Sequence, residues 1–149
     1  MSTIEFDSVT AKQIADITEA LDTSWLVLTS TLVFFMQAGF MLVEVGGARV
    51  QHATGVLLKN YGDSLIVSMV FLFSYGLAFG DSSSNGGFIG TTNFFISDEK
   101  YAFWFFQSTF ASAAVTIISG CILERVTFGS YYVVAFWMSL LVYPCVCHW

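Results

Sequence analysis

Charged residues are scarce in this sequence: they make up 11% of its 149 residues, whereas 56% are hydrophobic. A soluble domain normally carries about a quarter charged residues, so the shortage argues against a soluble domain and indicates a membrane protein. Basic residues are the scarcest, with five Lys and Arg against eleven Asp and Glu and a net charge of −6. Because no basic patch exists, nucleic acid is not expected as a partner.

Catalytic and metal-binding patterns are also missing. The three cysteines, Cys121, Cys145 and Cys147, lack the spacing of a zinc site, because the pair in "CVC" has no second pair to complete it. We expect them to be small buried hydrophobic side chains. The apolar segments contain no nucleophile–base pair and no metal cluster. The sequence therefore predicts no enzyme activity, no metal and no cofactor.

Four long apolar segments dominate the sequence instead. A bilayer core about 30 Å thick requires roughly 20 mostly apolar residues per helix. The segments that reach this length are residues 25–46, 57–79, 101–123 and 126–147. None has the alternating pattern of about ten residues expected for a transmembrane strand. The predicted fold class is all-α, a multi-pass bundle of transmembrane helices.

Residues 1–23 form a polar segment ahead of the first span. The segment holds five acidic residues and one lysine, and it lacks the basic start and short apolar core of a signal peptide. We expect a tail that stays on the mature protein and is partly helical around residues 11–21.

The few basic residues predict how the chain crosses the membrane. Arg49 and Lys59 belong to the first connection and its flanks, and Arg125 to the third, whereas Lys12 and Lys100 are the bases of the tail and of the second connection. The positive-inside rule then places the first and third connections in the cytoplasm. The tail and residues 81–100 are expected outside.

The last span ends with "LVYPCVCHW" and is still apolar at Trp149. We expect the chain to be a piece of a larger protein, because bundles that conduct a solute usually need more helices around the path. Pro144 lies near the outer end of this span and is expected to bend or terminate the helix.

Ionisable residues near the spans have structural explanations. Glu44 lies near the end of the first span, where its carboxylate can reach interfacial water. Lys59 and Asp63 are spaced i,i+4, which favours a local ion pair. Glu124 and Arg125 occupy a short turn and are expected to be an interfacial capping pair.

One face of the third span has a pattern of its own. Phe106 and Phe110 share this face at i,i+4 spacing, Gln107 flanks it, and it continues through small residues to Ile117. Aromatic rings attract cations, so two rings above an apolar row could admit a cation and then oppose passage of its charge. The same rings could equally face lipid or pack against neighbours, as many phenylalanines do. The pattern alone leaves both interpretations open.

Several motifs in order resolve this ambiguity. They are "FFMQAGFMLVEVGGAR" (34–49), "VLLKNYGD" (56–63), "SYGLAFG" (74–80), "GFIGTTNFF" (87–95), "FFQSTFASAAVTIISGCILERVTF" (105–128) and "YPCVCHW" (143–149). The string resembles the N-terminal part of the Amt/Mep/Rh ammonium transporter family, in particular its Amt branch, over residues 24–149. One departure is "QH" at 51–52, where the family usually has "KN".

The resemblance implies four helices of an eleven-helix fold that forms a homotrimer with one hydrophobic pore per subunit. Phe106 and Phe110 match the family's gate phenylalanines, and Phe110 also belongs to the recruitment site. Gln107 matches a family glutamine, which we expect to hydrogen-bond to an adjacent helix, and Ile117 is expected to line the pore. The family's two pore histidines lie in later segments, so His148 is expected to be a structural residue at the membrane boundary.

The resemblance thus implies an ammonium or ammonia channel in the plasma membrane, with the N-terminus outside and with only part of the pore in this chain. Alone, the 149 residues are not expected to conduct. The alternative is a non-transporting membrane module of the same family, either a sensor or an assembly partner.

Overall fold

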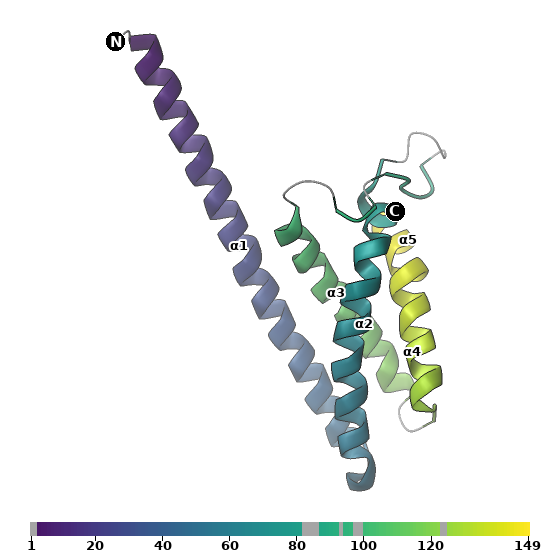
Figure 1. Ribbon diagram of the computed structural model, residues 1–149. Helices are drawn as coiled ribbons and strands as arrows, with labels where there is room; N and C mark the ends of the chain where they lie inside the picture. The colour runs from purple at the N-terminus through teal and green to yellow at the C-terminus, as the bar shows by residue number, and fades with distance from the viewer. Residues whose placement is uncertain (1–2, 82–86, 93, 97–99, 123–124) are drawn as a thin grey trace.

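The computed structural model describes residues 3–81, 87–92, 94–96, 100–122 and 125–149, and the regular elements of this part of the chain are all helices, without strands (Figure 1). The elements are α1 (Thr3–Gly47), a 3-10 turn η1 (Val50–His52), α2 (Ala53–Phe79), α3 (Tyr101–Cys121), α4 (Phe128–Trp137), a π-helical segment η2 (Met138–Val142) and α5 (Tyr143–His148). Glu124 of the expected capping pair lies outside the described residues.

Among the described residues, four helical segments are long and apolar enough to cross a membrane, which confirms the predicted fold class. They are Val9–Gly47, Val50–Phe79, Tyr101–Cys121 and Phe128–His148. Each reaches the roughly 20 residues that a bilayer core requires. The last one combines α4, η2 and α5 into a single continuous rod.

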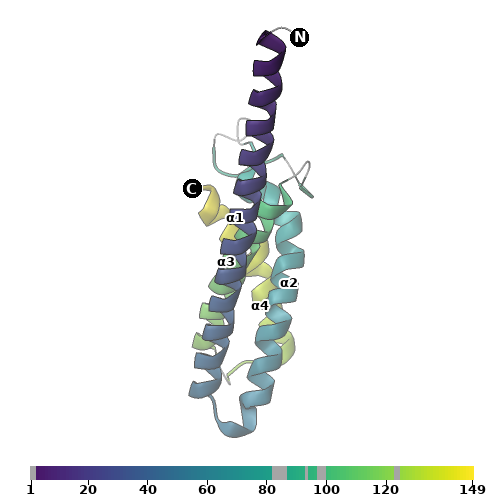
Figure 2. The same cartoon turned by 90° about the vertical axis from the view of Figure 1, so that its left-hand side faces the viewer.

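The first helix begins much earlier than the sequence pattern indicates. α1 runs without a break from the polar tail into the first span, and its N-terminal half projects beyond the rest of the bundle (Figures 1 and 2). Ser24, which could have capped a new helix, donates instead to the carbonyl of Ala20 at 2.7 Å. Because nothing between residues 9 and 24 breaks the backbone ladder, tail and span form one helix.

The core lies where α2 packs against α3 and the last span. Its fully buried members include Phe71, Ala111 and Ala135, one from each of these segments. The Phe71 ring makes edge contacts with Tyr75 and Tyr143 at centroid distances of 6.2 and 5.7 Å. Small residues on α3 and α4 let the backbones approach this ring closely, as expected for helices that pack in lipid.

The last span contains a π-helical segment and does not end at its proline. Pro144 is buried and the helix continues past it to His148, so the expected termination does not occur. The π-helical segment Met138–Val142 ends two residues before the proline, where the missing backbone N–H would otherwise disturb the ladder. Within this segment the Ser139 carbonyl accepts a hydrogen bond from Ser74 of α2 at 3.0 Å.

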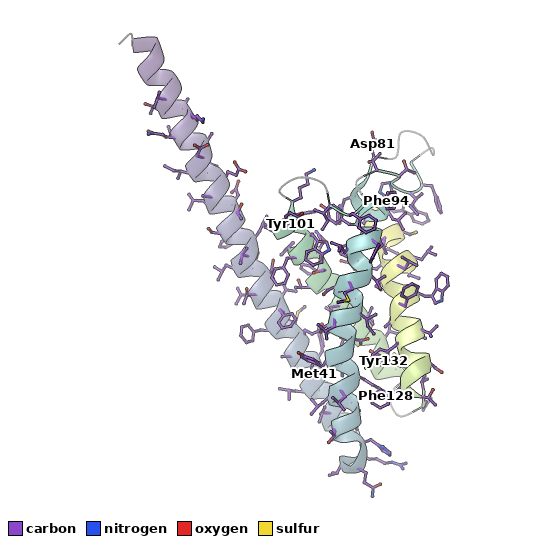
Figure 3. All side chains as sticks on the ribbon, in the orientation of Figure 1. Met41, Asp81, Phe94, Tyr101, Phe128 and Tyr132 are labelled. Carbon is purple, nitrogen blue, oxygen red and sulfur yellow. The ribbon has the colours of Figure 1, made fainter. Side chains whose placement is uncertain are left out.

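The two ends of the bundle differ in what they bring together. Tyr101, at the start of α3, lies at the same end as Asp81 and Phe94, whereas Phe128 and Tyr132 lie toward the other end (Figure 3). The first half of α3 therefore lies near the end from which α1 projects.

Phe71→Ala is expected to lower the free energy of unfolding by about 3–5 kcal/mol, because it leaves a cavity between three helices. Detergent-solubilised protein titrated with SDS and followed by circular dichroism measures this loss. Phe73→Ala is the matched control, since Phe73 is half exposed and packs mainly on Phe95. Equal losses for the two variants would contradict the assignment of Phe71 to the core.

Candidate functional site

The two phenylalanines of α3 form a ring pair. Their centroids are 5.0 Å apart and the ring planes meet at 75°, an edge-to-face contact. Phe106 is half-buried, whereas 37% of the surface of Phe110 is exposed. Both rings lie in the first half of α3, one to three turns from Tyr101. The i,i+4 spacing thus places them side by side, as the sequence predicts.

Gln107 lies beside this pair, but the described residues do not form the expected hydrogen bond with it. Its side chain is half-buried, and no described residue forms a hydrogen bond with it. The neighbouring hydroxyls turn back onto their own helix: Ser108 donates to the Phe105 carbonyl and Thr109 to the Phe106 carbonyl. The expected bond from Gln107 to an adjacent helix therefore stays a prediction, because the described residues supply no partner for it.

The ring pair belongs to a face of α3 that no other described part of the chain covers. Phe110, Ile117 and Cys121 are exposed along it, and Phe106 and Ala114 are half-buried between them. The opposite face is buried against α1 and α2 and carries Ser112, Thr116 and Ser119 among others. We call the first row (Phe106, Phe110, Ala114, Ile117, Cys121) the open face of α3. Cys121 is consequently exposed, not buried as expected.

A buried glutamine on α1 joins the opposite face of α3, and the sequence reading missed it. Gln37 is 2% exposed, and its Nε2 donates to Thr116 Oγ1 at 2.7 Å. The same nitrogen lies 3.4 Å from Ser64 Oγ of α2. The signal was available in the polar residue at the middle of an apolar span, which must find partners on neighbouring helices.

Glu44 joins the same three helices two turns further along α1. It accepts hydrogen bonds from Asn60 Nδ2 of α2 at 2.8 Å and from the Ser119 hydroxyl of α3. The carboxylate is half-buried, so its place near the helix end does not leave it simply in interfacial water. Glu44 and Gln37 together with their partners make a polar seam between α1, α2 and α3.

The expected ion pair between Lys59 and Asp63 does not form. Asp63 is fully buried and accepts a hydrogen bond from the Tyr131 hydroxyl of α4. Lys59 points toward the third connection, where its Nζ donates to the Val126 carbonyl at 3.1 Å and lies 5.1 Å from the Phe128 ring centroid. Partners on a neighbouring helix replace the local i,i+4 partner, because α2 packs directly on α4.

Comparison with known proteins decides the family. A family model described as Ammonium Transporter Family matches residues 24–149. The chain belongs to the ammonium transporter family. Ammonium transporter 3 of Dictyostelium discoideum is 37% identical over 87% of this chain and 30% of that relative. Ammonium transporter Amt2 of Archaeoglobus fulgidus is 37% identical over 87% of this chain and 28% of its own length.

Further relatives agree in fold and sequence. A putative ammonium transporter of Synechocystis is 36% identical over 91% of this chain and 33% of its own length. A solved structure titled Sensor Amt Protein superposes with a TM-score of 0.84 at 34% identity, covering 91% of this chain and 35% of that chain. This member of the ammonium transporter family thus spans about a third of the length of these relatives, and its four spans make it a multi-pass membrane protein.

In this member of the ammonium transporter family, the histidine of the last span has a partner on α2. His148 Nδ1 lies 3.0 Å from the carbonyl of Ala78 at the end of α2. Next to it, Trp149 Nε1 donates to the Phe88 carbonyl at 3.0 Å, and the two aromatic rings touch. Both side chains thus fasten the end of the last span to neighbouring segments. In the part of the chain that the structure describes, no group of His, Cys, Asp and Glu could hold a metal ion.

Tyr131→Phe is expected to lower the free energy of unfolding by about 1–3 kcal/mol, because the buried Asp63 carboxylate loses its hydrogen-bond donor. SDS titration of detergent-solubilised protein measures the loss. Tyr132→Phe is the control: its hydroxyl makes only a long contact, 3.4 Å from the Leu58 carbonyl, and the change should stay within about 0.5 kcal/mol. A loss for Tyr132→Phe as large as for Tyr131→Phe would show that the Asp63 contact is not the source.

Proposed function

We propose that this chain supplies one wall of a path that carries ammonium or ammonia across the membrane. The observation that supports this best is the open face of α3, which carries an aromatic pair followed by an apolar row. The names of the relatives, which are ammonium transporters, support the choice of solute. In this proposal Phe106 and Phe110 are the gate and recruitment rings, and Ile117 lines the path beyond them.

The chemistry of the open face suits a small cation at its entrance and a neutral molecule beyond it. Ring faces attract a cation by about 0.5–2 kcal/mol each, depending on how much water is removed. The Gln107 carbonyl next to the rings can accept an N–H from ammonium. Past Phe110 the row offers Ala114 and Ile117, which cannot compensate a charge, so passage of the ion is penalised by several kcal/mol.

The proposal includes an orientation and an assembly. We place the N-terminus outside and the protein in the plasma membrane as a homotrimer when its full complement of helices is present. The arrangement of the bases supports the orientation, since Lys59 of α2 contacts Val126 and Phe128 next to Arg125. The first and third connections, which hold most of the basic residues, therefore meet at one end of the bundle.

A second function is favoured by one observation, the similarity to the structure titled Sensor Amt Protein. In that case the same face would bind ammonium and report it without letting it cross. The two functions differ in net flux, so binding and uptake measured on the same protein separate them.

Phe110→Ala in the complete gene product is expected to weaken the apparent affinity for methylammonium about 2- to 30-fold, which is the loss of one cation–π contact expressed as a ratio. Uptake of labelled methylammonium by cells that lack their own ammonium transporters measures this change. Phe105→Ala is the matched control, because Phe105 is equally exposed at 37% but lies off the open face.

Surface labelling of each variant confirms that it reaches the membrane. If the unchanged protein reaches the surface and gives no uptake but binds ammonium, the sensor function replaces the transport function. If Phe110→Ala and Phe105→Ala behave alike, the open face of α3 is not the path.

A further inference from the structure

Two buried side-chain oxygens of α2 have no hydrogen-bond partner among the described residues. They are Asn60 Oδ1 and Asp63 Oδ1, on side chains that are 1% and 0% exposed. We call them the orphan oxygens of α2. Residues three apart lie one above the other on a helix face, so the two side chains are neighbours. Because an unsatisfied buried acceptor is costly, both atoms call for a donor.

The amide nitrogen of Asn60 determines which of its atoms is the orphan. Nδ2 donates to Glu44 Oε2 at 2.8 Å and to the Val56 carbonyl at 3.2 Å. Turning the amide over would direct its oxygen at a carboxylate and a carbonyl, which only accept. Asn60 Oδ1 therefore remains an acceptor that needs a donor.

The orphan oxygens leave no room for a partner molecule. Neither atom offers surface that a water molecule could touch, because the packed helices enclose both of them. A protein segment from outside this chain cannot reach them either. A metal cation needs about six oxygen ligands, which two orphan atoms do not supply. The missing partner therefore has to be as small as a proton.

The charges around Asp63 also favour a proton. Its titratable neighbours are Glu44 of α1 and Tyr131 and Tyr132 of α4. Lys59, one turn away on α2, directs its ammonium to the Val126 carbonyl instead. α3 and α4 contain no charged side chain within their bounds. Two carboxylates in one cluster inside the membrane repel each other, and a proton on one of them removes this repulsion.

The hydrogen bonds assign the proton to Asp63 and not to Glu44. Both oxygens of Glu44 accept, Oε2 from Asn60 and Oε1 from the Ser119 hydroxyl, as an ionised carboxylate does. On Asp63 only Oδ2 accepts, from the Tyr131 hydroxyl. A proton on Asp63 Oδ1 turns this atom into a donor to Asn60 Oδ1 and satisfies both orphan oxygens at once.

We propose that the bundle binds one proton at neutral pH between Asp63 Oδ1 and Asn60 Oδ1, inside the membrane. The contacts of Glu44 and Tyr131 connect this proton site to α1 and α4. Ser119, the contribution of α3 to the cluster, lies on its buried face, so the proton site is separate from the open face. The proposal does not depend on which solute the protein handles.

Infrared spectroscopy of the complete gene product in lipid bilayers tests where the proton lies. A protonated carboxyl group has a carbonyl stretch that an ionised carboxylate lacks, and carboxyl-labelled ¹³C-aspartate shifts this band only when an aspartic acid carries the proton. At neutral pH we expect one such aspartic acid band to be lost in Asp63→Asn. The band should persist in the control Glu44→Gln.

The same two variants make a second, independent test by SDS titration. An asparagine at 63 can accept from Tyr131 and donate to Asn60, as the protonated acid does, so its unfolding equilibrium constant should stay within about twofold of the unchanged protein. A glutamine at 44 turns its amide nitrogen toward a donor. Glu44→Gln should therefore raise the unfolding equilibrium constant by about 5- to 150-fold.

Three results overturn the proposal. Identical aspartic acid bands in the unchanged protein and in Asp63→Asn would show that Asp63 is ionised. Loss of a protonated carboxyl band in Glu44→Gln alone would place the proton on Glu44. Destabilisation or misfolding of Asp63→Asn to the same extent as Glu44→Gln would show that Asp63 acts as a charged acceptor.

Discussion

Interhelical hydrogen bonds from a few buried or half-buried polar side chains fix the arrangement of this bundle. Lipid offers no hydrogen-bond partners, so Gln37 and Glu44 of α1 and Asp63 of α2 must find theirs on neighbouring helices. Each selects a different pair: Gln37 joins α1 to α3, Glu44 joins both to α2, and Asp63 joins α2 to α4. These bonds specify which faces turn inward more than they add stability, since interhelical hydrogen bonds in a membrane protein average about 0.6 kcal/mol. Removing one partner costs more where it leaves a buried group such as the Asp63 carboxyl group unsatisfied.

The character of α3 follows from that constraint. Because its hydroxyl-bearing face is committed to the polar seam with α1 and α2, its aromatic and aliphatic face is left open. α1 is divided in the same way: Gln37 and Glu44 pack against α2 and α3, whereas apolar side chains such as Phe35 and Leu42 are exposed. A helix that satisfies its polar groups within the chain thus presents its apolar side to whatever lies outside, which is a solute path in the case proposed for α3.

Much of the fold could be predicted from hydropathy, because length and apolar content alone identify a span. The ring pair at Phe106 and Phe110 was also predictable, since i,i+4 spacing is a property of the helix itself. The partners of Asp63 and Lys59 were not, because they depend on α2 packing against α4. Gln37 was overlooked, although any polar residue inside a span requires a partner, and α1 began early because no residue at its polar end breaks the helix.

The most direct measurement is a structure of the complete gene product in lipid nanodiscs, at a resolution that shows acyl chains. If the open face of α3 lines a path, other protein segments will enclose Phe110 and Ile117, and no acyl chain will touch them. Acyl chains packed along Phe110 and Ile117 would contradict the account, since the face would then be an ordinary lipid-facing surface.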